Sequence, residues 1–202
     1  MKGGKGLFHM REFAIDGHDG AGKTPVIERV THLLTAAGAR VYIAAPLQEA
    51  NRHAAGGQIY SLWERDETAV QAMQLVSSAI RSAREEATEQ RCDVLLFDRH
   101  WLTVMAEVAD RPIGSLWTDF VPLFFLTAPP SKTMACQRFS FDIPWTSSKE
   151  KIAYYYARYL QIAERYGMHV RRTFSIERRD TDLTPVVEQI VADILVKGDS
   201  TS

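Results

Sequence analysis

The octapeptide GHDGAGKT at residues 17–24 constrains the fold of this chain more than any other stretch. It fits the pattern G-x-x-x-x-G-K-[ST], in which the glycines let the backbone fold into a nest of N–H groups around a phosphate. An apolar run, EFAID at residues 12–16, precedes it, and an amphipathic helical pattern at residues 23–38 follows it. This is the strand–loop–helix context that the pattern requires. The sequence therefore predicts a nucleotide-binding loop between a strand and a helix.

The chemistry of this loop is concentrated at its end. The following helix adds its positive N-terminal end to the backbone N–H groups. Lys23 can reach the outer phosphates of a nucleotide as a point charge, and the Thr24 hydroxyl can bind Mg²⁺. The residues that we expect to bind the nucleotide are Gly17, His18, Asp19, Gly20, Ala21, Gly22, Lys23 and Thr24. The competing interpretation is a glycine-rich turn without a ligand.

Pro25 stands directly after the loop, in the first helical turn. A proline is sterically tolerated there, and its missing N–H leaves no helical hydrogen bond unmade. In related loops this N–H contacts the α-phosphate, so its loss is expected to weaken nucleotide binding by about 1.5–3 kcal/mol. The contacts to the β- and γ-phosphates do not depend on it.

Short apolar runs alternate with longer helical patterns along the rest of the chain, which is the rhythm of a parallel α/β sheet. Strands are predicted at residues 12–16, 39–46, 93–98, 121–130 and 169–177. Helices are predicted at residues 23–38, 68–90, 147–167 and 184–196. The segment at 47–57, rich in Ala, Gly and Asn, is expected to loop over the sheet edge. We therefore predict an α/β, P-loop NTPase three-layer fold: a five-stranded parallel sheet with helices on both faces and a short lid.

Length and composition favour one globular domain. The 202 residues are enough to bury a sizeable core, and 46% of them are hydrophobic. No internal repeat or linker interrupts the pattern. We expect a single P-loop kinase domain over 11–202 with its lid at about 138–150. Residues 1–10 are expected to be an extension without a role in the fold, with His9-Met10 as a candidate cloning junction.

The overall charge excludes broad binding to polyanions. With 24 Lys and Arg against 25 Asp and Glu, the formal net charge is -1, which predicts no nucleic-acid partner and no anionic membrane surface. No apolar run reaches the roughly 18 residues that span a bilayer. Cys92 and Cys136 form no paired metal-ligand spacing. We expect a cytoplasmic protein.

With Asp19 inside it, the loop resembles that of the thymidylate kinase family, D-G-x-G-K-[ST]. The resemblance continues in LLFDRH at 95–100, which is similar to a family strand that ends in Asp-Arg-Tyr. It also continues in SSAIRSAREE at 77–86, which is similar to the family's acceptor-binding helix. The stretch LFFLTAPPSKTMACQR at 123–138 resembles the strand, turn and helix that lead into the lid. YLQIAER at 159–165 resembles the helix after the lid, with Tyr159 in the family's tyrosine position. The resemblance covers most of the chain from Phe13 onward.

This resemblance implies a role for several side chains. Asp98 would hold Mg²⁺ or orient the acceptor, and Arg99 and Arg81 would grip an acceptor phosphate with their planar guanidinium groups. Asp19 and His100 would face the acceptor. Arg138 would close from the lid and neutralise charge on the transferring phosphoryl group. The competing interpretations are a helix-capping Asp98, a surface salt bridge for Arg81 or Arg99, and a solvated Arg138.

The chain also departs from the family, mainly on the acceptor side. Its second strand runs into AAPLQEANRHAAGG, which lacks the family's Arg-Glu pair, and the stretch between Arg138 and Lys149 has few basic residues. His100 replaces a tyrosine. The tyrosine-rich helix at 147–167 favours packing over a base-stacking platform, and His18 and His169 have no partner at catalytic or metal spacing.

Together these features predict an ATP- and Mg²⁺-dependent phosphotransferase, most simply a nucleoside monophosphate kinase of thymidylate kinase type. One alternative is a kinase of a free nucleoside or another small hydroxyl compound. Another, from a different class, is a non-catalytic nucleotide-binding regulatory module. The resemblance implies a homodimer, and the apolar face of the 68–90 helix is either its interface or core.

Overall fold

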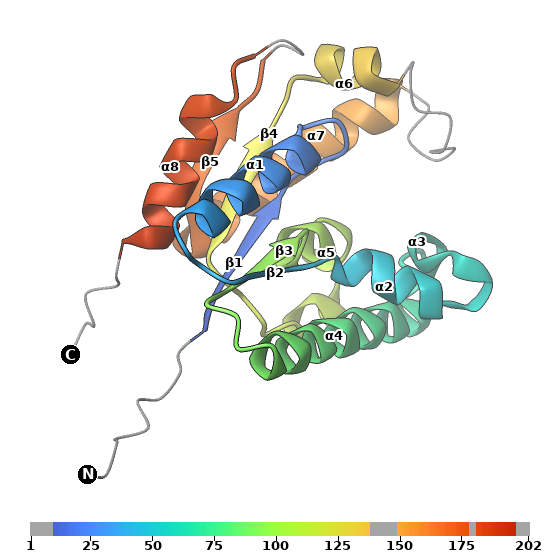
Figure 1. Ribbon diagram of the computed structural model, residues 1–202. Helices are drawn as coiled ribbons and strands as arrows, with labels where there is room; N and C mark the ends of the chain where they lie inside the picture. Colours follow the sequence, from blue (N-terminus) through green and yellow to red (C-terminus); the bar gives the residue numbers. More distant parts are fainter. Residues whose placement is uncertain (1–9, 138–148, 178–180, 197–202) are drawn as a thin grey trace.

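The computed structural model describes residues 10–137, 149–177 and 181–196 and contains one five-stranded, all-parallel sheet with the strand order β2-β3-β1-β4-β5 (Figure 1). The strands are β1 (Arg11–Asp16), β2 (Val41–Ala44), β3 (Val94–Asp98), β4 (Leu123–Thr127) and β5 (Val170–Ser175). The predicted α/β P-loop fold is confirmed, with each expected strand present. β1 lies at the centre of the sheet, so the loop that follows it emerges in the middle of the carboxyl edge.

Helices cover both faces of this sheet (Figure 1). They are α1 (Lys23–Ala36), α2 (Pro46–His53), α3 (Ile59–Leu62), α4 (Asp66–Glu89), α5 (Trp101–Val108), α6 (Pro130–Gln137), α7 (Lys149–Arg165) and α8 (Thr184–Leu195). Short 3₁₀ turns lie at Ala55–Gly57, Pro112–Leu116 and Gly167–His169. No helix in the described ranges is long and apolar enough to cross a membrane.

Alternating side chains on the strands build two separate cores. Phe13 and Ile15 of β1 pack with α1 and α8, whereas Ala14 between them faces the opposite side. That second core joins β1, β3 and β4 to α2, α4, α5 and α7. Because neighbouring strand residues point to opposite faces, near-continuous apolar strands are what a sheet covered on both sides needs.

The apolar face of α4 is core. Ala72, Val76 and Ile80 are fully or almost fully buried within this chain, and the helix packs along α2. Of the two alternatives for this face, core or dimer interface, the structure shows core. A homodimer stays a prediction, and it would have to use another surface.

The segment after β2 differs from the sequence prediction. Residues 46–53 form helix α2 rather than a loop, with Pro46 in its first turn and Leu47 and Ala50 buried. Glu49 pairs with Arg52 and His53, three and four residues later, on the exposed side. These spacings stabilise a helix, and Gly56, at φ +71°, lies just beyond it. The predicted lid at about 138–150, with Arg138, lies almost wholly outside the described residues.

Candidate active site

Two glycines of the 17–24 loop are required by its geometry. Gly17 has φ +153°, and a Cβ there would lie 2.0 Å from the carbonyl oxygen of Leu126 in β4. Gly22 has φ +95° and precedes the first residue of α1, where a side chain would be strained. The loop therefore lies against the end of β4 and turns directly into α1. This is a cradle that fits phosphate groups.

Lys23 lies beneath this cradle. Its Nζ donates to the carbonyl oxygens of Gly17 (2.9 Å) and His18 (3.0 Å), and the side chain is buried. Burial, with the nearby Arg99, lowers the pKa of Lys23 to about 8. The ammonium thus stabilises the loop, and its predicted contact with the outer phosphates of a nucleotide stays a prediction.

Asp16, the last residue of β1, connects the start of the loop to the start of α5 through hydrogen bonds. It is fully buried, and its carboxylate accepts hydrogen bonds from the backbone N–H groups of Gly17 (2.7 Å) and His100 (2.9 Å). The hydroxyl of Thr103 donates to it at 2.7 Å, and the Tyr159 hydroxyl in turn donates to Thr103 at 2.9 Å. The sequence analysis missed Asp16. It is a positioning residue that joins β1, α5 and α7.

Asp98 and Thr24 are the candidate metal ligands, and their surroundings fit Mg²⁺. Asp98 pairs in register with Ile15, which places its carboxylate at the carboxyl edge beside the loop. Its Oδ1 is buried and has no hydrogen-bond partner in the described part of the chain, and burial raises its pKa. Thr24 is exposed in the first turn of α1. An unsatisfied carboxylate oxygen beside a phosphate cradle suits a cation that is shared with phosphates and water.

Arg99 and Asp19 form an ion pair across the mouth of the loop. Arg99 also donates to the Gly17 carbonyl at 3.3 Å, and its own backbone has φ +66°, a conformation that is uncommon outside glycine. The pKa of Asp19 is lowered, because the attraction of Arg99 and Lys23 outweighs the effect of burial. The structure thus brings together two residues that the sequence predicted for the acceptor.

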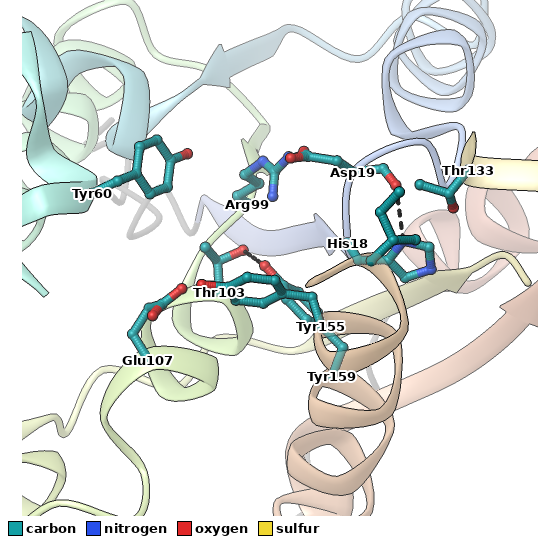
Figure 2. A pocket seen from close by; sticks show the side chains of 10 residues that line it. His18, Asp19, Tyr60, Arg99, Thr103, Glu107, Thr133, Tyr155 and Tyr159 are labelled. Carbon is teal, nitrogen blue, oxygen red and sulfur yellow. Dashed lines mark hydrogen bonds and ion pairs between the residues drawn. The ribbon is translucent and has the colours of Figure 1, made fainter. Parts of the chain in front are cut away.

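A narrow pocket opens beside this pair (Figure 2). Its lining residues are His18, Asp19, Tyr60, Arg99, Thr103, Glu107, Thr133, Ile152, Tyr155 and Tyr159. They come from the loop, the end of β3, α3, α5, α6 and α7, so the pocket exists only in the folded chain. We call it the central pocket. Its volume is about 30 Å³, which is room for a few water molecules at most.

Glu107, Tyr155 and Tyr60 were not predicted for this site. Glu107 is partly buried on α5, its pKa is raised by burial, and it accepts a hydrogen bond from Tyr155 of α7. The pKa values of Tyr155 and Tyr60 are raised as well, in both cases chiefly by burial. One signal in the sequence was available: Glu107 is the single charged residue in the apolar helix WLTVMAEV.

The structure does not bring two other predicted residues to the central pocket. Arg81 is exposed on α4 and does not line it. His100 is fully buried, with its ring between Phe97 and Trp117, and burial lowers its pKa to about 3. The arginine of α4 that does make contacts is Arg84, which bridges Glu12 and Asp119. Its role is structural.

His18 supports the loop from below. Its Nε2 accepts a hydrogen bond from the backbone N–H of Ala128 at 3.0 Å, so its Nδ1 carries the proton toward the Asp19 carbonyl at 2.9 Å. Burial lowers its pKa to about 4, so the ring is neutral at physiological pH. The side chain of His18 therefore stabilises the loop, and the predicted contact of residue 18 with a nucleotide stays a prediction.

Comparisons with known proteins support the fold. No protein-family model and no curated protein matches this sequence. Among solved structures, the chain is similar to a deoxyadenosine kinase from M. mycoides, determined with the products dCMP and a flexible dCDP bound. The two chains are 12% identical with a TM-score of 0.58, and the match covers 91% of this chain and 98% of the other. At this identity the likeness establishes a P-loop kinase fold.

Proposed function

We propose that this protein is an ATP- and Mg²⁺-dependent kinase that phosphorylates a nucleoside or a close relative. One observation carries the proposal. The ion pair of Asp19 and Arg99 belongs both to the phosphate cradle and to the central pocket, so the donor site and the acceptor pocket share a wall. A phosphoryl group held by the cradle would face a molecule held in the pocket. The kinase of similar fold, which acts on deoxyadenosine by its name, supports the same reading.

On the donor side, the backbone of residues 17–24 and Lys23 would hold the phosphates of ATP, and Thr24 and Asp98 would hold Mg²⁺. The metal ion, when bound, neutralises charge on the phosphates. Lys23 already sits against the loop at 2.9 and 3.0 Å from two of its carbonyls, so it needs only to turn toward the ligand. Pro25 lies exposed in the first turn of α1, consistent with a loop that lacks only its α-phosphate contact.

The charges of the central pocket favour an acceptor without a phosphate. Its lining contains two carboxylates, Asp19 and Glu107, and one guanidinium, Arg99, which is already paired with Asp19. Among the lining residues that the structure describes, an acceptor phosphate would meet one engaged cation and two negative groups, a poor balance for a dianion. Arg81, the second predicted phosphate ligand, does not line the pocket. We therefore place a nucleoside first and a monophosphate of thymidylate type second.

Transfer in such a site depends on positioning and charge stabilisation rather than on a covalent intermediate. Asp98 would orient the metal or the acceptor hydroxyl, and Arg99 would hold Asp19 in place at the boundary between the two sites. The hydroxyl group of the acceptor would displace ADP from the γ-phosphorus. The chain's buried network below the loop, from Asp16 through Thr103 to Tyr159, would keep α5 and α7 aligned.

The test is a phosphorylation assay with ATP and Mg²⁺ against matched nucleosides and nucleoside 5′-monophosphates. ADP and the phosphorylated products would be separated by chromatography, with Lys23→Met as the blank. Turnover of a nucleoside that disappears in Lys23→Met supports the proposal. Turnover of a monophosphate alone would replace it with the monophosphate kinase. ATP binding without turnover across the whole panel would favour the non-catalytic module.

A further inference from the structure

The central pocket has two ends with different charge. At one end, Asp19 is neutralised by Arg99 beside the loop. At the other lie Glu107 and Tyr60, which Figure 2 shows on the side away from His18 and Thr133. A ligand whose hydroxyl reaches the loop would therefore place its far end against Glu107 and Tyr60. This assignment rests on the proposed function, because it takes the pocket as the acceptor site.

The carboxylate of Glu107 is partly buried and lines the central pocket. Among the described residues no lysine, arginine or histidine lies within 4.0 Å of it. The charges of Arg158 and Arg111 act to lower the pKa of Glu107, but both side chains are paired elsewhere, Arg158 with Asp110 and Arg111 with Asp66. The hydrogen bond from Tyr155 satisfies one acceptor position of about four.

A partly buried carboxylate without a neighbouring cation favours a ligand that brings N–H donors to it, because hydrogen bonds to a charged acceptor are stronger than those between neutral groups. The ring of Tyr60 lies at the same end of the pocket, and the apolar side chain of Ile152 also lines it. A planar heterocycle with an exocyclic amino group has the matching shape and donors. A carbonyl at the same ring position would instead point a lone pair at the carboxylate and be repelled.

We propose that Glu107 determines the specificity of the central pocket and selects acceptors whose base carries an amino group on its outer edge. Cytosine and adenine have this group, whereas uracil, thymine and hypoxanthine carry a carbonyl in its place. The thymidylate-type acceptor inferred from the sequence resemblance is thereby disfavoured. Tyr155 positions the Glu107 carboxylate through its hydroxyl.

The test uses two ligand pairs that differ at the one ring position: deoxycytidine against deoxyuridine, and deoxyadenosine against deoxyinosine. Calorimetric titration of the full-length protein, in the presence of the non-hydrolysable ATP analogue AMP-PNP and Mg²⁺, measures each dissociation constant. We expect the amino member to bind roughly 10- to 100-fold more tightly in at least one pair, as for one hydrogen bond to a charged group. Glu107→Gln, which turns one acceptor atom into a donor, should reduce this ratio to about threefold or less.

Glu85→Gln, an exposed glutamate on α4, is the matched control and should keep the wild-type ratio. Tyr155→Phe should weaken binding of the amino member while retaining the preference. The inference is overturned if the wild-type protein binds the members of both pairs equally, prefers the carbonyl members, or binds none of the four. It is also overturned if Glu107→Gln keeps the preference. The wild-type ratio requires no variant, so a misfolded Glu107→Gln leaves the inference falsifiable.

Parallel assays of ADP formation separate this inference from the proposed function. Phosphorylation of both members of each pair at equal kcat/KM, together with equal affinities, would leave the kinase standing and remove the role of Glu107. A clear preference in binding, without phosphorylation of any nucleoside or monophosphate, would leave the amino-selective pocket standing and remove the kinase.

Discussion

At the scale of single residues, Lys23 shows how a site can hold a charge in readiness for a ligand. Its ammonium is buried against two loop carbonyls, and its pKa is lowered to about 8. An incoming phosphate would offset the free-energy cost of burying this charge. We expect Lys23→Met to lower kcat by at least about 10²–10³-fold, as for loss of one donor to the transition state. Arg29→Met, exposed on the same helix, should keep full activity in the same assay of ADP formation. Activity in Lys23→Met within tenfold of wild type would contradict the role.

Arg99 and Arg81 make a second pair of single-residue predictions. Arg99 is partly buried and bound to Asp19, whereas Arg81 is exposed and outside the central pocket. Arg99→Gln leaves Asp19 without its partner, so we expect kcat/KM for the acceptor to fall by about 10–100-fold. Arg81→Gln should stay within about twofold of wild type. Steady-state kinetics of both variants checks this. An equal loss of kcat/KM in Arg81→Gln would show that Arg81 takes part in binding the acceptor.

At the scale of elements, three of them meet at one carboxylate. Asp16 ends β1, Thr103 lies on α5 and Tyr159 on α7, and the Thr103 hydroxyl connects the other two. Thr103→Val keeps the shape and removes that connection, which leaves the buried Tyr159 hydroxyl and one Asp16 oxygen short of a partner. We expect a loss of about 1.5–3 kcal/mol in the free energy of unfolding, measured by urea denaturation. Thr35→Val, on the exposed side of α1, should change it by less than about 0.5 kcal/mol. A loss no larger than in this control would show that the connection contributes no stability.

At the scale of the whole molecule, buried histidines make folding sensitive to acid. The pKa of His100 falls from 6.5 to about 3 in the folded chain, chiefly through burial, and that of His18 falls to about 4. Between the folded pKa of each histidine and pH 6.5, that histidine is largely protonated in the unfolded chain but neutral in the native chain. The free energy of unfolding should therefore be fully retained above pH 6.5 and fall as the pH drops below it.

His100→Phe removes one of these two groups. Between pH 6 and 4, the free energy of unfolding of this variant should decrease less steeply with falling pH than that of the wild type. The difference in slope should be up to about 1.4 kcal/mol per pH unit. Urea denaturation at a series of pH values measures the slope. His32→Phe, at an exposed position of α1, is the control and should keep the wild-type slope. Parallel slopes in wild type and His100→Phe would show that His100 titrates normally in the folded protein.

The sequence alone determined the parts of this protein that depend on short-range geometry. The loop at 17–24 needs glycines at particular φ angles, a lysine at its end and a helix after it, and all of these are neighbours in the chain. Apolar runs bounded by turns likewise predicted all five strands, because a sheet covered on both faces leaves little room for polar residues. Asp98 and Arg99 were assigned from the resemblance of LLFDRH at 95–100 to the thymidylate kinase family, and their roles stay predictions.

Only the tertiary structure decided which side chains line the central pocket. Tyr60, Glu107 and Tyr155 lie on three different helices, and the sequence carries no record of their meeting. Position along a helix matters equally: Arg81 faces solvent, whereas Arg84, about one turn further along α4, reaches Glu12 and Asp119. His100 follows Arg99 directly, yet its ring enters the core. Local pattern specifies a loop, but the packing of distant elements sets the direction of each side chain and thereby the chemistry of the pocket.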